Sequence, residues 1–164
     1  MAGLEDLYRE IILDHYRAPR NRGELPVPPA HKVEGFNPLC GDEVVLYLEL
    51  DPSTQSVTDV KIGGQGCSIS QASTSMMSAE VKGKSLDEVR RLIRAFKALM
   101  SIHESKLEGE ADGADLEAQL DGVRLGDLEA LQGVVKFPVR IKCATLAWNT
   151  LQQGLDESES ATTA

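Results

Sequence analysis

Apolar and polar residues alternate in three short segments in the first half of the chain. Strands are expected over residues 33–36, 43–50 and 57–62, because β-branched and aromatic residues recur there between turn residues. Between the second and third segments, Asp51-Pro52-Ser53-Thr54-Gln55 is typical of a turn. Strands joined by such short connections predict an antiparallel meander.

Elsewhere, apolar residues recur at steps of three and four, which is typical of amphipathic helices. The helices expected from this spacing cover residues 4–16, 67–81, 86–99, 125–131 and 138–153. Pro19 should stop the first helix, and Gly133 and Gly154 should end the last two. The acidic residues 104–122 predict a mobile excursion containing a short helix near residues 116–120.

This order of elements predicts an α+β fold, a small three-stranded antiparallel sheet with helices packed on one face. The 164 residues suffice for one core, and a single domain is expected over residues 1–155. The polar residues 156–164 are expected to form a disordered tail. No apolar run approaches the roughly 20 residues of a membrane span, and no signal segment opens the chain. We therefore expect a cytoplasmic protein without a membrane partner.

Charge and composition argue against a nucleic-acid partner. The chain carries 17 basic and 26 acidic residues, a net charge of −9, and its aromatic content is 4%. Phosphate binding needs basic patches and base stacking needs aromatic side chains. Three arginines, Arg17, Arg20 and Arg22, lie in or beside the proline-rich connection of residues 18–30. They belong either to a solvated loop or to a basic docking surface for an acidic partner. His15 lies on an apolar helix face and is expected to pack rather than to bind a ligand.

Three cysteines carry the most informative chemistry. Their odd number argues against a disulfide scaffold and favours reduced thiols. Cys40 precedes Gly41 and Asp42, so thiol and carboxylate can point at one ion from a loop. Cys67 follows a glycine-rich run at an expected helix N-terminus, where free N–H groups and the helix dipole lower a thiol pKa. Cys143 lies in the last helix beside basic residues that also favour the thiolate.

Together Cys40, Asp42, Cys67 and Cys143 have the number and type of ligands that a tetrahedral metal site needs. The alternative for each cysteine is an inert, buried small hydrophobe. No pair has the C-x-x-C spacing, so the residues alone leave open a metal or sulfur site and an inert role.

Four segments resemble the U-type iron–sulfur cluster assembly proteins, and within them the SufU branch. The segments are Leu7–Tyr16, Asn37–Asp42, Gly64–Ser73 and Phe137–Trp148. Two differences separate the chain from the IscU branch: Lys142 stands where that branch has a histidine, and Gly133–Pro138 lacks its paired prolines. The acidic residues 104–122 resemble an insertion typical of SufU proteins.

The resemblance implies an α+β fold and a site at one exposed end, with Cys40, Asp42, Cys67 and Cys143 as ligands of Zn²⁺. It implies a sulfur acceptor in iron–sulfur cluster biogenesis, which takes persulfide sulfur from a pyridoxal-phosphate cysteine desulfurase of the SufS or IscS type. Cys40 is the expected acceptor, because it lies on a loop beside Gly41. A downstream cluster scaffold or apo-acceptor protein would receive the sulfur. The alternatives are a scaffold, in which the same residues hold a transient [2Fe–2S] cluster for delivery to apo-proteins, and a purely structural zinc domain.

Overall fold

An antiparallel sheet forms one layer of the structure, a computed structural model that describes residues 4–27, 29–38, 41–108 and 125–163. The strands are β1 (His31–Asn37), β2 (Asp42–Asp51) and β3 (Ser56–Gln65). They lie in the order β1-β2-β3, with Val33 opposite Leu46 and Leu46 opposite Ile62. These opposed side chains are all buried, so one face of the sheet is turned toward the core. The predicted three-stranded meander is confirmed.

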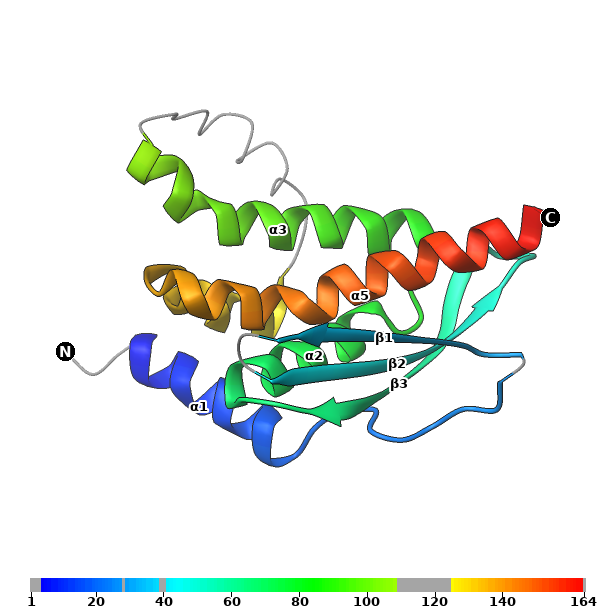
Figure 1. The fold of residues 1–164 in the computed structure, drawn as a ribbon, viewed down its shortest axis with the longest axis horizontal. Coiled ribbons are helices and arrows are strands. Elements are labelled where there is room, and N and C mark those ends of the chain that lie inside the picture. Colours follow the sequence, from blue (N-terminus) through cyan, green and yellow to red (C-terminus); the bar gives the residue numbers. More distant parts are fainter. Residues whose placement is uncertain (1–3, 28, 39–40, 109–124, 164) are drawn as a thin grey trace.

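Helical segments form the remaining layers. They are α1 (Leu4–Arg17), α2 (Ser68–Val81), α3 (Leu86–Glu108), the 3₁₀ segment η1 (Gly126–Lys136) and α5 (Pro138–Thr163). Helices α2 and α5 pack on the sheet, α1 packs on α2 and η1, and α3 lies along α5 (Figure 1). The predicted α+β fold is therefore confirmed, with helices on the face of the sheet that carries the buried residues.

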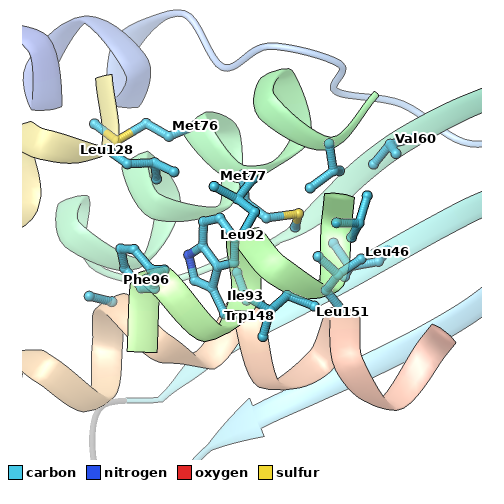
Figure 2. Close-up of a cluster of buried hydrophobic side chains, with 14 of the residues drawn as sticks. Leu46, Val60, Met76, Met77, Leu92, Ile93, Phe96, Leu128, Trp148 and Leu151 are labelled. Carbon is cyan, nitrogen blue, oxygen red and sulfur yellow. The ribbon is translucent and has the colours of Figure 1, made fainter. Parts of the chain in front are cut away.

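The core lies between the sheet and these helices (Figure 2). Leu46 and Val60 project from the strands toward Leu151 of α5 in one continuous cluster. Phe96 of α3 stacks on Trp148 of α5, with ring centroids 4.4 Å apart and an angle of 19° between the rings. Such a pair adds about 1 kcal/mol to the free energy of burial. The stack therefore holds α3 against α5.

Helices α2 and α5 are also joined by one buried hydroxyl. Ser73 of α2 donates a hydrogen bond to the carbonyl oxygen of Ala144 over 2.6 Å. The indole Nε1–H of Trp148 donates to the same Ser73 oxygen over 3.1 Å. All three residues are buried, so the Ser73 hydroxyl and the indole N–H depend on these bonds for a partner in place of water.

Helix α5 is longer than the sequence predicts, because Gly154 does not end it. A Cβ atom at Gly154 would lie 2.8 Å from both Leu48 Cδ1 and Val33 Cγ1. The glycine thus allows close approach of the helix to the strands. The helix continues over residues 156–163, where we expected a disordered tail, and Glu157 there contacts His31 of β1. Although α5 is long, no helix among the described residues is both long and apolar enough to cross a membrane.

Two other helical segments extend beyond their predicted ends. The 3₁₀ segment η1 continues through Gly133 to Lys136, so the end predicted at Gly133 is wrong. Helix α3 extends beyond the predicted end at residue 99, to Glu108. The short helix expected near residues 116–120 lies outside the described residues.

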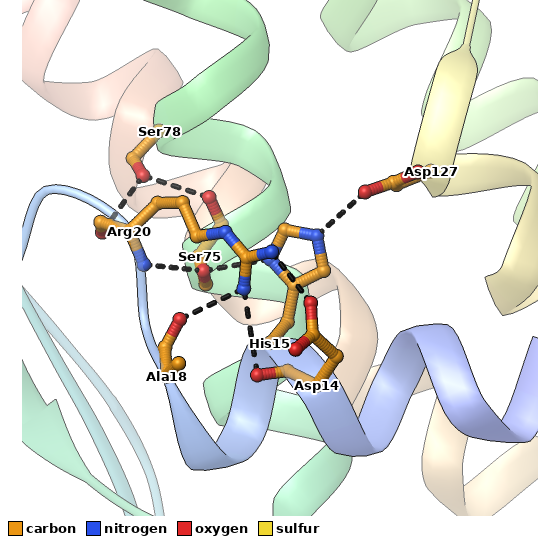
Figure 3. A network of polar contacts seen from close by, with 7 residues as sticks. All are labelled: Asp14, His15, Ala18, Arg20, Ser75, Ser78 and Asp127. Atoms are coloured by element: carbon orange, nitrogen blue, oxygen red, sulfur yellow. Dashed lines mark hydrogen bonds and ion pairs between the residues drawn. The ribbon is translucent and has the colours of Figure 1, made fainter.

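A polar network around His15 holds α1 against α2 and η1 (Figure 3). His15 Nδ1 lies 2.8 Å from the hydroxyl of Ser75 on α2, and Nε2 lies 2.8 Å from a carboxylate oxygen of Asp127 on η1. The backbone N–H of Arg20 donates to the same Ser75 oxygen over 2.8 Å. A neutral His15 with its proton on Nε2 satisfies every one of these groups. As expected, His15 is a packing residue.

Ser73→Ala should lower the free energy of unfolding by about 1–3 kcal/mol, because it leaves the indole N–H of Trp148 buried without this partner and removes the bond to the Ala144 carbonyl. The change is measured by urea unfolding followed by circular dichroism. Tryptophan fluorescence is unsuitable, because Trp148 is the only tryptophan and is itself replaced in the comparison below. Trp148→Phe should lower the free energy of unfolding less in the Ser73→Ala variant than in the wild-type protein. Equal costs in the two backgrounds would show that the hydroxyl and the indole do not interact.

His15→Ala should lower the free energy of unfolding by about 2–4 kcal/mol, because it creates a cavity and removes both ring hydrogen bonds. Arg20→Ala is the matched control. It removes an exposed ion pair with Asp14 and keeps the backbone N–H that bonds Ser75, so it should cost about 0–1 kcal/mol. Equal losses in the two variants would contradict the structural role of the network.

Candidate metal centre

Three segments distant in sequence bring two thiols and a carboxylate together. Asp42 is the first residue of β2, Cys67 immediately precedes α2, and Cys143 lies in the second turn of α5. These segments meet at one end of the sheet (Figure 1). The ligand atoms of the three residues all lie within 4.8 Å of one another. Cys40, two residues before Asp42, lies outside the described residues.

The Asp42 carboxylate is fully buried and already oriented by the backbone. Its Oδ1 accepts a hydrogen bond from the N–H of Cys67 over 2.9 Å. Its Oδ2 lies 3.9 Å from the sulfur of Cys67. The carboxylate therefore has one oxygen in a hydrogen bond and the other directed toward the thiol.

The sulfur of Cys67 lies at the N-terminus of α2, as the sequence predicted. Cys67 is the N-cap residue, and its Sγ accepts a hydrogen bond from the N–H of Ser70 over 3.4 Å. The first N–H groups of a helix and its dipole favour a negative charge at this position. Cys67 is half-buried, so part of the residue lies within reach of solvent.

Glycines allow the segment before Cys67 to approach β2 closely. At Gly66, a Cβ atom would lie 2.5 Å from Asp42 Oδ1 and 3.0 Å from its Cγ, so a side chain there would displace the carboxylate. Gly64 has a φ of +105°, and a Cβ atom there would overlap the backbone carbonyl of Glu43. Gly41, beside Asp42, has a φ of +67° in the left-handed region. The glycine-rich run thus shapes the site.

Cys143 is fully buried on the inner side of α5, with its Sγ 3.9 Å from the carbonyl oxygen of Val139. Arg140 lies one turn earlier and is exposed. The negative charges of the Cys67 and Cys143 thiolates raise the pKa of the Arg140 guanidinium. Arg140 therefore serves as a positive neighbour to both sulfurs. The sequence indicated that Arg140 would lie near Cys143. It did not indicate that Arg140 would also lie near Cys67.

The donor set and its spacing fit a zinc ion. A tetrahedral zinc site with Zn–S bonds of about 2.3 Å separates its sulfur ligands by about 3.8 Å. The Cys67 sulfur and the Asp42 oxygen are already 3.9 Å apart, and no pair in the cluster exceeds 4.8 Å. Small side-chain movements would therefore suffice to bind a metal. No histidine belongs to this cluster among the described residues.

Curated relatives resemble the chain over nearly its whole length. The "Zinc-dependent sulfurtransferase SufU" of Bacillus subtilis is 42% identical over 158 residues, which cover 96% of this chain and 95% of that protein. The "Iron-sulfur cluster assembly scaffold protein IscU" of Streptococcus pyogenes is 37% identical over 161 residues, which cover 98% of this chain and 90% of that protein.

Solved structures share the fold. The SufU protein of Fervidobacterium islandicum superposes with a TM-score of 0.71 at 33% identity, covering 93% of this chain and 99% of that one. A NifU-like N-terminal protein from Brucella abortus has a TM-score of 0.70 at 22% identity, covering 96% and 99% of the two chains, a likeness of fold alone. The sequence profile described as "NifU-like N terminal domain" matches residues 7–163. The chain therefore belongs to the family of NifU-like N-terminal domains.

Proposed function

We propose that this protein is a zinc-dependent sulfur acceptor in iron–sulfur cluster assembly, with a pyridoxal-phosphate cysteine desulfurase as its sulfur donor. The observation that carries the proposal is the convergence of Asp42, Cys67 and Cys143 within 4.8 Å. The similarity to a relative named a zinc-dependent sulfurtransferase supports the same chemistry. We further propose that residues 1–155 act as one domain and that a cluster scaffold or an apo-acceptor protein receives the sulfur.

The proposed zinc ligands are Cys40, Asp42, Cys67 and Cys143. Zinc bound there would keep the cysteine sulfurs deprotonated at neutral pH. The chain helps to orient these ligands, because the N–H of Ser70 donates a hydrogen bond to the Cys67 sulfur. The N–H of Cys67 holds the Asp42 carboxylate in place.

Cys40 is the proposed sulfur acceptor. Cys143 is fully buried in a helix and Cys67 is bound to the first turn of α2, so both are held by regular structure. Cys40 adjoins Gly41, whose left-handed backbone belongs to the connection between β1 and β2. The Cys40 thiolate attacks the terminal sulfur of the donor's cysteine persulfide and forms a new S–S bond. The donor's S–S bond breaks, and its cysteine leaves as a thiolate with the electron pair, so no oxidant is consumed.

The second candidate is a scaffold that assembles a [2Fe–2S] cluster as its cargo. Cysteine thiolates are the usual protein ligands of such clusters. The similarity to a relative named an IscU scaffold favours this alternative. A carboxylate in place of a fourth thiolate would make the cluster easier to release. Lys142, where the IscU branch has a histidine, and the acidic residues 104–122 favour the sulfur acceptor.

The two functions are separated by the metal and sulfide content of anaerobically purified protein. A sulfur acceptor should contain one zinc per chain and no acid-labile sulfide. It should accelerate alanine formation by a desulfurase and gain persulfide sulfur that mass spectrometry locates on Cys40. Cys40→Ser should lose both effects. A visible cluster that passes to an apo-ferredoxin would instead establish the scaffold and overturn the proposal.

Gly66→Ala should weaken zinc binding about 10- to 100-fold, because the new methyl group would occupy the space of the Asp42 carboxylate. Competition with a chromophoric chelator measures the affinity. Gly133→Ala is the matched control, since a Cβ atom there has no described neighbour within 4 Å. Unchanged zinc affinity in Gly66→Ala would show that the position of Asp42 does not matter for the metal.

A further inference from the structure

Ser70, in the first turn of α2, carries a hydroxyl that is buried without a partner. The residue is fully buried, and its Oγ forms no hydrogen bond with any group in the part of the chain that the structure describes. The nearby hydroxyls of Ser73 and Thr74 are satisfied, since they donate to the carbonyl oxygens of Ala144 and of Ser70 itself. A buried hydroxyl without a partner is unfavourable, because it has given up its hydrogen bonds to water. Such groups are rare in folded proteins, so this one needs a reason.

The position of Ser70 relates it to the candidate metal centre. Its backbone N–H donates to the Cys67 sulfur over 3.4 Å. Residues three apart share one face of a helix, and one turn further along the same face Ser73 contacts Ala144 of α5, the neighbour of Cys143. Helical side chains lean toward the N-terminus of their own helix. The Ser70 hydroxyl therefore extends back toward Cys67, on the side of α2 that is turned to α5.

The reason that Ser70 lacks a partner lies in Asp42. At many helix N-termini the side chain three residues after the N-cap accepts the backbone N–H of the N-cap residue. Here the Asp42 Oδ1 accepts that N–H from Cys67 over 2.9 Å. The thiol of Cys67 is directed at the other oxygen of the same carboxylate, with Sγ 3.9 Å from Oδ2. Asp42 thus takes both donors of Cys67, and the Ser70 hydroxyl remains a donor without an acceptor.

The Cys67 sulfur becomes a better acceptor when it binds a metal, because the thiol then loses its proton and carries a negative charge. Hydrogen bonds to charged acceptors are shorter and stronger than those to neutral ones. A hydroxyl hydrogen can rotate toward such an acceptor without any movement of the backbone. We propose that the Ser70 hydroxyl donates a hydrogen bond to the Cys67 thiolate of the metal-loaded site and is a positioning residue for that ligand.

This inference rests on the proposed function, in which the site binds zinc, and it assigns different roles to the cysteines. A sulfur that shares its charge with a metal, the N–H and the O–H of Ser70 is a weak nucleophile. Ser70 therefore keeps Cys67 as a ligand, which leaves sulfur uptake to the proposed acceptor Cys40. The hydroxyl is unfavourable in the metal-free protein and favourable in the loaded one, so its whole effect falls on metal affinity.

Ser70→Ala should weaken zinc binding about 10-fold, because it removes a hydrogen bond to a metal ligand. The urea midpoint of the zinc-free protein should stay the same or rise, since a methyl group replaces an unpaired buried hydroxyl. Competition with a chromophoric chelator measures the affinity. Ser68→Ala is the matched control, the same substitution at a half-buried residue of the same turn, and should leave the zinc affinity unchanged.

A second measurement identifies the sulfur that accepts the bond. At saturating zinc, iodoacetamide should alkylate Cys67 about fivefold faster in Ser70→Ala than in the wild-type protein, because the thiolate regains nucleophilicity. Mass spectrometry of peptides gives the rate at each cysteine, and the rate at Cys143 should not change. A faster reaction at Cys143 with an unchanged rate at Cys67 would assign the hydroxyl to the other sulfur and overturn the proposal.

The outcomes also separate this inference from the proposed function. Wild-type protein that holds zinc but takes up no persulfide sulfur would refute the function and leave the Ser70 bond to be measured as described. Protein that binds no zinc would refute both. Equal zinc affinities of Ser70→Ala and the wild-type protein would refute the Ser70 bond alone. A lower urea midpoint of the zinc-free variant would show that the hydroxyl has a structural partner without metal, and would likewise overturn the proposal.

Discussion

The site depends on how rigidly α2 and α5 are joined, because each helix supplies one of the two described sulfurs. The Ser73 hydroxyl provides that constraint by bonding the Ala144 carbonyl and the Trp148 indole together. Ser73 lies six residues after Cys67, and Ala144 is adjacent to Cys143. Any sliding of one helix against the other would break these buried hydrogen bonds. The core therefore contributes to holding the two sulfurs near each other.

The sheet supplies the third group by a different means. Asp42 is placed by strand pairing, since it lies opposite Asn37 at the end of β1. Gly66 leaves room for its carboxylate to reach the N–H of Cys67. Backbone pairing, helix packing and a missing side chain thus each determine one part of the arrangement. The arrangement of the site therefore also depends on residues outside it, in the core and in the glycine-rich run.

Much of this architecture could be predicted from local patterns in the sequence. Alternation and turn residues gave the strands, and the glycine-rich run before Cys67 indicated a helix N-terminus. The exceptions are residues whose meaning depends on distant neighbours. Gly154 looks like a helix end but allows contact with Val33 and Leu48. The partners of His15 lie 60 and 112 residues away, so no local pattern identifies them. The proximity of Arg140 to both sulfurs likewise exists only in the folded chain.

The hydrogen bond between Asp42 and Cys67 also bears on which metals the site can distinguish. Because Oδ1 accepts the backbone N–H, Oδ2 is the Asp42 oxygen with both lone pairs available to an incoming ion. Magnesium requires octahedral oxygen coordination, and calcium requires six to eight oxygen ligands. A site with one available carboxylate oxygen among thiolates serves both ions poorly and suits softer metals. A single backbone amide thus contributes to metal selectivity, by favouring coordination through one carboxylate oxygen over coordination through two.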